Sequence, residues 1–179
     1  MEEKTQLPKW EGKTSAELKG PAAAEVWPLL ADFCNIYKWF QTLETSYRVE
    51  GVPGEPGLIR YCGHSGDDND EDDQTSDMIK FSAKEKLLMI DPIRRCLSYE
   101  VLDNSWGLKS YVATMQVLDL DLDLDGNNDQ SCRGCKIEWS FVCDPIEGWI
   151  YGDFISCLDS RLQSMARKME HDAILSRTS

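Results

Sequence analysis

The most regular pattern of apolar and polar positions lies near the C-terminal end of the chain. Asp144 before Pro145, with Glu147 close behind, has the composition of a helix start. We expect a helix over 147–175, which at ~1.5 Å per residue is roughly 40 Å long and needs a broad, curved partner to cover its apolar face. The apolar residues recur at the helical intervals of three and four: Tyr151, Phe154, Leu158, Leu162, Met165 and Met169.

The preceding residues supply such a partner, because most of them alternate between apolar and polar with a period of two. One strand is expected at 8–18, followed by two short helices at 22–33 and 34–43. The later strand segments begin at Tyr47 and at Leu58 and continue at 78–90, 95–102, 111–124 and 135–143. This order predicts a single domain over 1–179 of the α+β class, with an antiparallel sheet and a long C-terminal helix.

The charge of the chain narrows the range of partners. The 179 residues carry a net charge of −13, from 32 acidic and 19 basic side chains. A nucleic-acid backbone would be repelled, so no nucleic acid is expected as a partner. The apolar runs are too short to cross a bilayer, so no membrane insertion is expected, and the N-terminus shows no apolar secretory segment. Seven cysteines without an export signal favour reduced thiols and a cytoplasmic location.

Two patterns resemble metal-binding motifs, and both are incomplete. Cys132 and Cys135 have ligand spacing, but no second pair or suitably placed histidine accompanies them. The aspartates from Asp119 to Asp125 start like a calcium loop, yet the twelfth position counted from Asp121 is Cys132, where such a loop needs a glutamate. We therefore expect no metal and no cofactor. The acidic runs at 67–73 and 119–125 are more simply solvated loops or turns, although they could be partner sites.

The local motifs resemble the Bet v 1 and START-like superfamily, of the polyketide cyclase/dehydrase and lipid-transport type. The glycine-rich loop and strand EGVPGEPGLIR at 50–60 carry the first resemblance. It implies a helix-grip fold, in which a curved antiparallel sheet of seven strands surrounds a long C-terminal helix, two short helices follow the first strand, and an internal cavity lies between the sheet and the helix.

A closer resemblance is to the plant lachrymatory-factor synthases. The blocks KWEGK at 9–13, AKEKL at 83–87, YVATMQ at 111–116, WSFVC at 139–143 and IEG at 146–148 occur in the same order and at similar spacing. The resemblance implies that Arg60 and Glu85 handle proton transfer in a cavity that also contains Tyr111 and Trp139. Val101 stands where that family has a further cavity tyrosine, and the segment at 66–77 is longer and more acidic.

The strand pattern gives the same residues a physical reading. Arg60 lies on one strand face with Leu58 and Cys62, and Glu85 shares a face with Ala83 and Leu87. If these faces line the sheet interior, the two charges should pair, because isolated buried charges are very unfavourable. A paired Arg60 and Glu85 beside the Tyr111 phenol could shuttle a proton, organise the sheet, or hold the acidic group of a ligand.

We therefore expect a small hydrophobic ligand as the partner. The catalytic candidates are Arg60, Glu85 and Tyr111, and the function is that of a ligand carrier or sensor, or of a cofactor-free enzyme. Hormone-receptor activity ranks last, because no gate-loop signature is present. The early helix residues Tyr151, Phe154 and Leu158 should lie toward one end of the cavity. The expected ligand-contacting residues are Trp39, Phe81, Ala83, Val101, Trp139, Phe141, Phe154 and Leu158.

Overall fold

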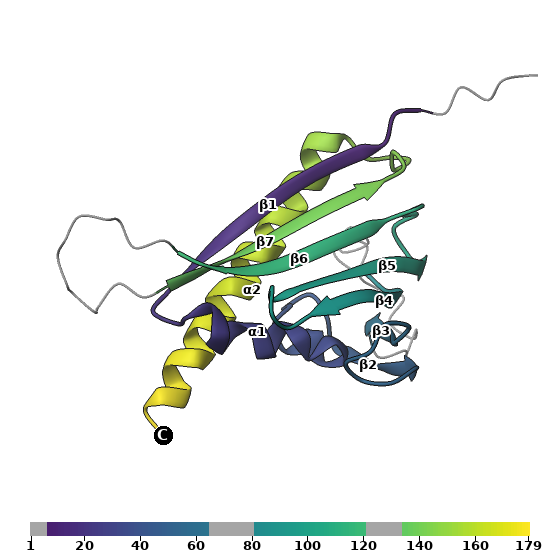
Figure 1. Ribbon diagram of the computed structural model, residues 1–179. Coiled ribbons are helices and arrows are strands. Elements are labelled where there is room, and N and C mark those ends of the chain that lie inside the picture. Colours follow the sequence, from purple (N-terminus) through teal and green to yellow (C-terminus); the bar gives the residue numbers. More distant parts are fainter. Residues whose placement is uncertain (1–6, 65–80, 121–133) are drawn as a thin grey trace, which may run out of the picture.

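The computed structural model describes residues 7–64, 81–120 and 134–179. Within these ranges the chain forms seven strands, two α-helices and one 3-10 helix (Figure 1). In chain order they are β1 (Trp10–Lys19), α1 (Ala23–Ala31), η1 (Phe33–Lys38), β2 (Thr45–Glu50), β3 (Ile59–Gly63), β4 (Ala83–Asp91), β5 (Cys96–Asn104), β6 (Val112–Asp119), β7 (Gly134–Cys143) and α2 (Tyr151–Arg177).

The strands make one antiparallel sheet in the order β1-β7-β6-β5-β4-β3-β2. Helix α2 runs diagonally across one face of this twisted sheet, and α1 lies near one end of it (Figure 1). The long helix therefore covers strands that lie far apart in the sequence. This arrangement confirms the predicted helix-grip fold of the α+β class.

Helix α2 holds the sheet through one buried stripe. Its 27 residues correspond to a length of about 40 Å. Fully burying a large apolar side chain stabilises a fold by about 1.5–3 kcal/mol, so this stripe is a major contribution to stability. The buried positions are Phe154, Leu158, Leu162, Met165, Ala166 and Met169, which match the predicted helical spacing except at Tyr151.

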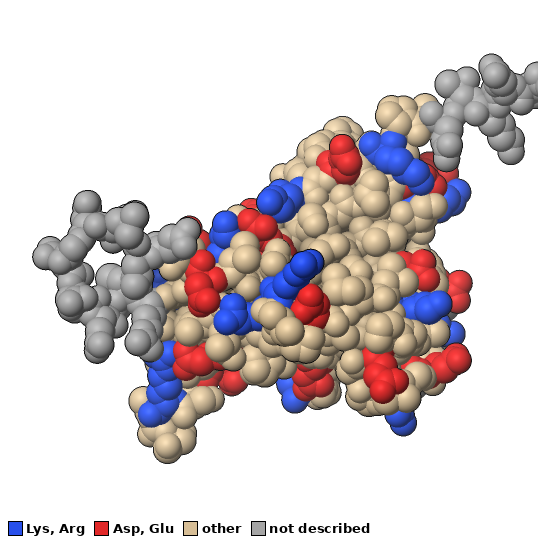
Figure 2. All heavy atoms as spheres, in the orientation of Figure 1, with Lys and Arg blue, Asp and Glu red and all other residues tan. Residues whose placement is uncertain are grey.

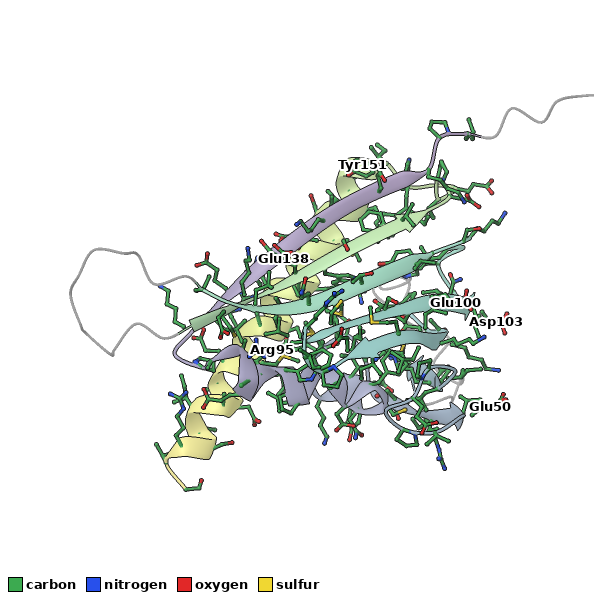
Figure 3. The ribbon with its side chains drawn as sticks, in the orientation of Figure 1. Glu50, Arg95, Glu100, Asp103, Glu138 and Tyr151 are labelled. Atoms are coloured by element: carbon green, nitrogen blue, oxygen red, sulfur yellow. The ribbon has the colours of Figure 1, made fainter. Side chains whose placement is uncertain are left out.

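Tyr151 lies outside the apolar interior, so its predicted place at the end of the cavity is wrong. Its side chain is 38% exposed, and its hydroxyl donates a hydrogen bond of 2.8 Å to the carbonyl of Glu11. Its ring meets Trp10 edge-on at a centroid distance of 5.7 Å. Figure 3 shows Tyr151 at the start of α2, beside β1. The phenol oxygen thereby finds a partner at the sheet edge.

The helix begins at Tyr151, which is later than the predicted start at 147. The predicted capping residue Asp144 instead forms an ion pair with Lys9, which lies just before β1. Gly148 then adopts a positive φ of 81°, which a glycine tolerates without strain. Residues 144–150 therefore form a turn between β7 and α2. Asp144 does not cap the helix but pairs with the segment before β1.

The second short helix is also shorter than predicted. It covers only η1, with 3-10 geometry, and Asn35 inside it departs from helical torsion angles. The Ser46 hydroxyl of β2 accepts the Tyr37 N–H at 3.2 Å and donates to the Cys34 carbonyl at 2.6 Å. These bonds tie η1 to the edge strand. The apolar residues at 39–43 therefore form a turn that leads into β2.

Residues 1–6, 65–80 and 121–133 lie outside the described residues and carry most of the excess negative charge of the sequence. They include Cys132, the acidic run at 67–73 and most of the aspartate run at 119–125. On the face shown in Figure 2, acidic and basic side chains alternate over the described surface. In the described ranges, no three side chains of the metal-ligating types cluster. No helix in this part of the chain has the length and apolar character needed to cross a membrane.

Candidate ligand cavity

A cavity lies between the sheet, η1 and the first half of α2. The empty space among its side chains is about 520 Å³, including its opening to solvent, and the centre of a water molecule can reach about 50 Å³ of it. Its lining is mostly apolar and aromatic. The lining residues are Ile36, Phe40, Leu43, Arg60, Cys62, Phe81, Glu85, Tyr99, Val101, Trp106, Leu108, Tyr111, Trp139, Phe154, Leu158 and Arg161.

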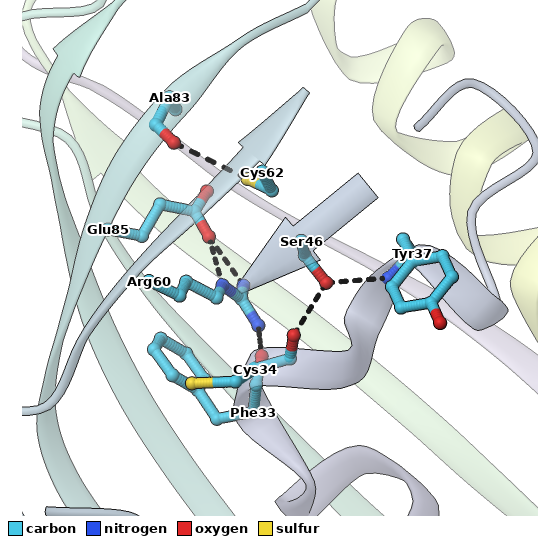
Figure 4. A network of polar contacts seen from close by, with 8 residues as sticks. All are labelled: Phe33, Cys34, Tyr37, Ser46, Arg60, Cys62, Ala83 and Glu85. Carbon is cyan, nitrogen blue, oxygen red and sulfur yellow. Dashed lines mark hydrogen bonds and ion pairs between the residues drawn. The ribbon is translucent and has the colours of Figure 1, made fainter. Parts of the chain in front are cut away.

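Arg60 and Glu85 form a buried ion pair on the cavity wall. The β3–β4 register places the two residues directly opposite each other on one face of the sheet. Arg60 Nε and Nη2 both donate to Glu85 Oε2, at 2.7 and 2.5 Å (Figure 4). The residues are only 4% and 5% exposed. A strand irregularity between Ala83 and Glu85 lies beside the pair and is of the kind that re-aims side chains.

The rest of the Arg60 guanidinium is held by η1. Its Nη1 donates to the Phe33 carbonyl at 2.6 Å, and its Cζ lies 3.7 Å from the centroid of the Phe33 ring. Burial lowers the pKa of Arg60, but the Glu85 carboxylate together with the nearby Cys62 and Tyr99 raises it, and the net pKa lies above its ordinary value. Arg60 is therefore a fixed cation whose charge is balanced within the wall.

Three polar groups of the lining form no hydrogen bond of regular geometry among the described residues. They are the Tyr111 hydroxyl, the Trp139 indole N–H and the Trp106 indole N–H, and all three atoms are buried. The pKa of Tyr111 is raised well above its usual range, first because burial disfavours the phenolate and then because the Glu85 carboxylate is near, while hydrogen-bonding contacts with Trp139 and Tyr99 oppose part of the rise. Tyr111 is thus a neutral hydroxyl that can donate a hydrogen bond.

Cys62 and Tyr99 complete the polar part of the wall, and both are neutral. The Cys62 thiol lies 3.7 Å from the Ala83 carbonyl, and burial, followed by the charge of Glu85, raises its pKa far above the ordinary value. Burial likewise raises the pKa of Tyr99 well above that of a free phenol. A thiol in this state is a poor nucleophile, because the thiolate is the reactive form.

An aromatic group with one cation closes another part of the cavity. The Trp106 ring, between β5 and β6, meets Phe81 edge-on at a centroid distance of 4.8 Å. Arg161 of α2 lies over these rings, with its Cζ 4.6 Å from the Trp106 centroid and 6.0 Å from that of Phe81. Its Nη1 donates to the Thr42 hydroxyl at 3.0 Å.

The structure brings most of the predicted site residues to one cavity. Arg60, Glu85 and Tyr111 line it together. So do five of the eight residues that were expected to contact the ligand: Phe81, Val101, Trp139, Phe154 and Leu158.

The other three expected residues do not line the cavity. The Phe141 ring is stacked on Tyr111 at 5.8 Å and meets Phe154 at 5.3 Å, so it lies one layer behind the wall. Ala83 is buried opposite Cys62, and its side chain is short. Trp39 faces a separate surface groove between the short helices and the C-terminal half of α2.

Two functional candidates are absent from the sequence-based set. Arg161 lies three residues after Leu158 and so shares its side of α2, a signal that helical spacing could have given. Trp106 lies in the loop between β5 and β6, where no periodicity fixes its direction. Its place in the lining depends on the path of this loop at the end of the two strands.

The fold and the cavity define a helix-grip domain built around an internal ligand site. A sequence profile of the polyketide cyclase / dehydrase and lipid transport family matches residues 9–171. The match covers nearly the whole chain, so the chain belongs to this family. A family of this description agrees with the mostly apolar cavity and supports the binding of a hydrophobic small molecule.

Solved structures from bacteria and a plant share the fold. The protein XoxI from Bacillus cereus matches with a TM-score of 0.64 and 18% identity, covering 92% of this chain and 95% of its own. A protein from Thermobifida fusca gives 0.65 and 20%, over 90% and 93% of the two chains. The ginseng major latex-like protein 151 from Panax ginseng gives 0.60 and 20%, over 91% and 97%. At these identities the likeness concerns the fold alone.

Proposed function

We propose that this protein binds a compact, mainly apolar molecule that carries an oxygen acceptor. The observation that carries the proposal is the set of three buried donors in the lining that form no hydrogen bond of regular geometry among the described residues: Tyr111, Trp139 and Trp106. A buried polar group left unpaired costs about 1–3 kcal/mol, so native proteins rarely keep several together without a purpose. A carbonyl, ether or acid oxygen of a ligand would accept a hydrogen bond from one or two of them.

The dimensions of the cavity favour a small ligand over a long acyl chain. Of the empty space of about 520 Å³, which includes the opening to solvent, only about 50 Å³ is open to the centre of a water molecule. That smaller volume corresponds to roughly three to five water positions. The apolar contacts would come from Phe154, Leu158 and Val101, and the orientation from the three donors.

The test is a binding measurement with matched ligands. Pairs of equal shape, such as cyclohexanone and methylenecyclohexane, are titrated into the protein and followed by ligand-observed NMR. The ketone should bind more tightly, and Tyr111→Phe should weaken it about three- to tenfold, as expected for one lost hydrogen bond. Tyr47→Phe is the matched control, because Tyr47 is exposed on β2. Equal binding of the two ligands, or no effect of Tyr111→Phe, would refute the role of the donors.

A second candidate is cofactor-free proton transfer of the lachrymatory-factor-synthase type. It is favoured by a carboxylate, a fixed cation and a neutral phenol on one cavity wall: Glu85, Arg60 and Tyr111. Arg60 occupies only Oε2 of Glu85, so Oε1 is the oxygen we assign to proton transfer. Glu85 would take the O–H proton of an alkenyl sulfenic acid and return it to the distal alkene carbon, so that C=C becomes C=S without loss of atoms.

The enzymatic candidate has its own assay. The protein is mixed with an alliinase and an alkenyl cysteine sulfoxide, and the thial S-oxide is quantified by mass spectrometry. Product from the wild type that is lost in Glu85→Gln, while circular dichroism is unchanged, would support it. The absence of product from the wild type would eliminate this candidate and leave the binding proposal intact.

A further inference from the structure

Arg161 differs from Arg60 in its charge balance. Within residues 7–64, 81–120 and 134–179, no carboxylate oxygen lies within 4.0 Å of the Arg161 guanidinium nitrogens, although Arg60 has Glu85 at 2.5 Å. The single hydrogen bond described for Arg161 uses Nη1 and goes to the Thr42 hydroxyl. A guanidinium has five N–H donors in a planar fork, so most of its donor capacity is available to a ligand.

Three separate parts of the fold hold this guanidinium in place. Helix α2 supplies the side chain, the turn after η1 supplies Thr42, and the rings of Trp106 and Phe81 supply the surface beneath it. A cation over an aromatic face gains roughly 0.5–2 kcal/mol, which favours this position of the guanidinium. The position of Arg161 is therefore set before any ligand arrives.

The charges of the lining do not cancel. Arg60 and Glu85 balance each other, and burial keeps Cys62, Tyr99 and Tyr111 neutral. Arg161 remains as one uncompensated positive charge in the lining, within a chain whose net charge is −13. The described lining contains no second carboxylate, so the complementary negative charge is missing from the wall itself.

We propose that Arg161 binds the carboxylate of the ligand, and that the natural ligand is a compact amphiphile with an apolar body and one carboxylate. This inference rests on the proposed binding function and narrows its ligand class. The guanidinium fork can bind a carboxylate through two parallel hydrogen bonds. The unpaired Trp106 N–H belongs to the same aromatic group and can add a third. The apolar body would then extend toward Leu158 and Phe154, which precede Arg161 on α2.

The test compares a carboxylate with its neutral isostere. 3-Phenylpropionate and 3-phenylpropanamide are titrated by calorimetry into wild type, Arg161→Met and Arg161→Lys. The wild type should prefer the carboxylate by about ten- to a hundredfold, in line with a hydrogen bond to a charged group. Arg161→Met should lose this preference for the carboxylate and keep the affinity for the amide. Arg161→Lys should keep part of the preference for the carboxylate. Arg167→Met is the control, because Arg167 is exposed on the same helix.

A second readout does not depend on affinity. The pKa of a ligand labelled with carbon-13 at its carboxyl group should fall below its free value when it is bound to the wild type, and less so when bound to Arg161→Met. The role of Arg161 would be overturned if the wild type bound acid and amide with equal affinity, or if Arg161→Met kept the preference for the acid. Binding of the amide would still support the proposed function in that case. Failure of both ligands to bind would overturn both.

Discussion

Replacing Glu85 with leucine while Arg60 is kept should lower the free energy of unfolding by about 3–5 kcal/mol. The substitution removes the counter-charge of a guanidinium that is only 4% exposed. A charge at this depth cannot recover its hydration without opening the β3–β4 wall. The loss therefore measures an uncompensated buried cation, and it should be much larger than the loss of an ordinary surface ion pair.

Replacing Arg60 with methionine should cost at least as much, for two reasons. It leaves the Glu85 carboxylate buried without a cation, and it removes the donor that the Phe33 carbonyl uses at 2.6 Å. A buried carbonyl without a donor costs about 1–3 kcal/mol. The double variant, Arg60→Met with Glu85→Leu, removes both charges and should lie within about 2 kcal/mol of the wild type, because paired apolar residues often replace a buried ion pair at little cost.

The assay is urea unfolding of the four proteins, followed by circular dichroism and tryptophan fluorescence. The two single losses should exceed the loss of the double variant, which gives a coupling energy of several kcal/mol between the two positions. Lys13→Met serves as the control, because Lys13 pairs with Glu138 at 3.3 Å from an exposed position. Its loss should stay below about 1 kcal/mol.

Additive losses for Arg60 and Glu85, or single losses as small as that of Lys13→Met, would refute the reasoning. Either result would mean that water reaches the pair in solution. The cavity would then contain water at this wall, and Glu85 would be a hydrated carboxylate and not a buried one.

Three further predictions concern stability. Tyr111→Phe should leave the ligand-free protein as stable as the wild type or about 1 kcal/mol more stable, because its buried hydroxyl forms no hydrogen bond of regular geometry. Tyr151→Phe should lose about 0.5–1.5 kcal/mol with its bond to the Glu11 carbonyl, and urea unfolding of both variants checks the contrast. Leu162→Ala should lower the free energy of unfolding by about 2–5 kcal/mol and Leu175→Ala by less than about 0.5 kcal/mol, because the first side chain is fully buried and the second is exposed. A reversed order in thermal or urea unfolding would contradict the packing of α2. The free energy of unfolding should fall as the pH rises above about 9, because burial raises the pKa of Cys135 to about 12 and that of Cys143 to about 11. The unfolded chain therefore releases these two protons at lower pH than the folded protein does. Urea titrations from about pH 7 to about pH 11 measure the decline, and a flat profile would contradict the burial of both thiols.

The sequence by itself determined the sheet face on which the predicted site residues of the strands lie. Alternation put Arg60 and Glu85 on buried faces, and the structure places both there. Helical spacing likewise identified the stripe of α2 from Phe154 to Met169. Both results follow from local geometry, because the periods of two and of about 3.6 residues are properties of the backbone and do not depend on what packs against the element.

Tertiary structure alone decided which of these buried residues meet a cavity and which partners their polar atoms find. Asp144 looked like a helix cap, yet it pairs with Lys9 from the other end of the chain. Phe141 and Tyr111 both lie on the inner side of the sheet, but only Tyr111 lines the cavity. Trp106 enters the lining from a loop without periodicity and stacks beneath Arg161 of the distant helix. These outcomes depend on register, loop path and side-chain packing between remote segments, and no local pattern records them.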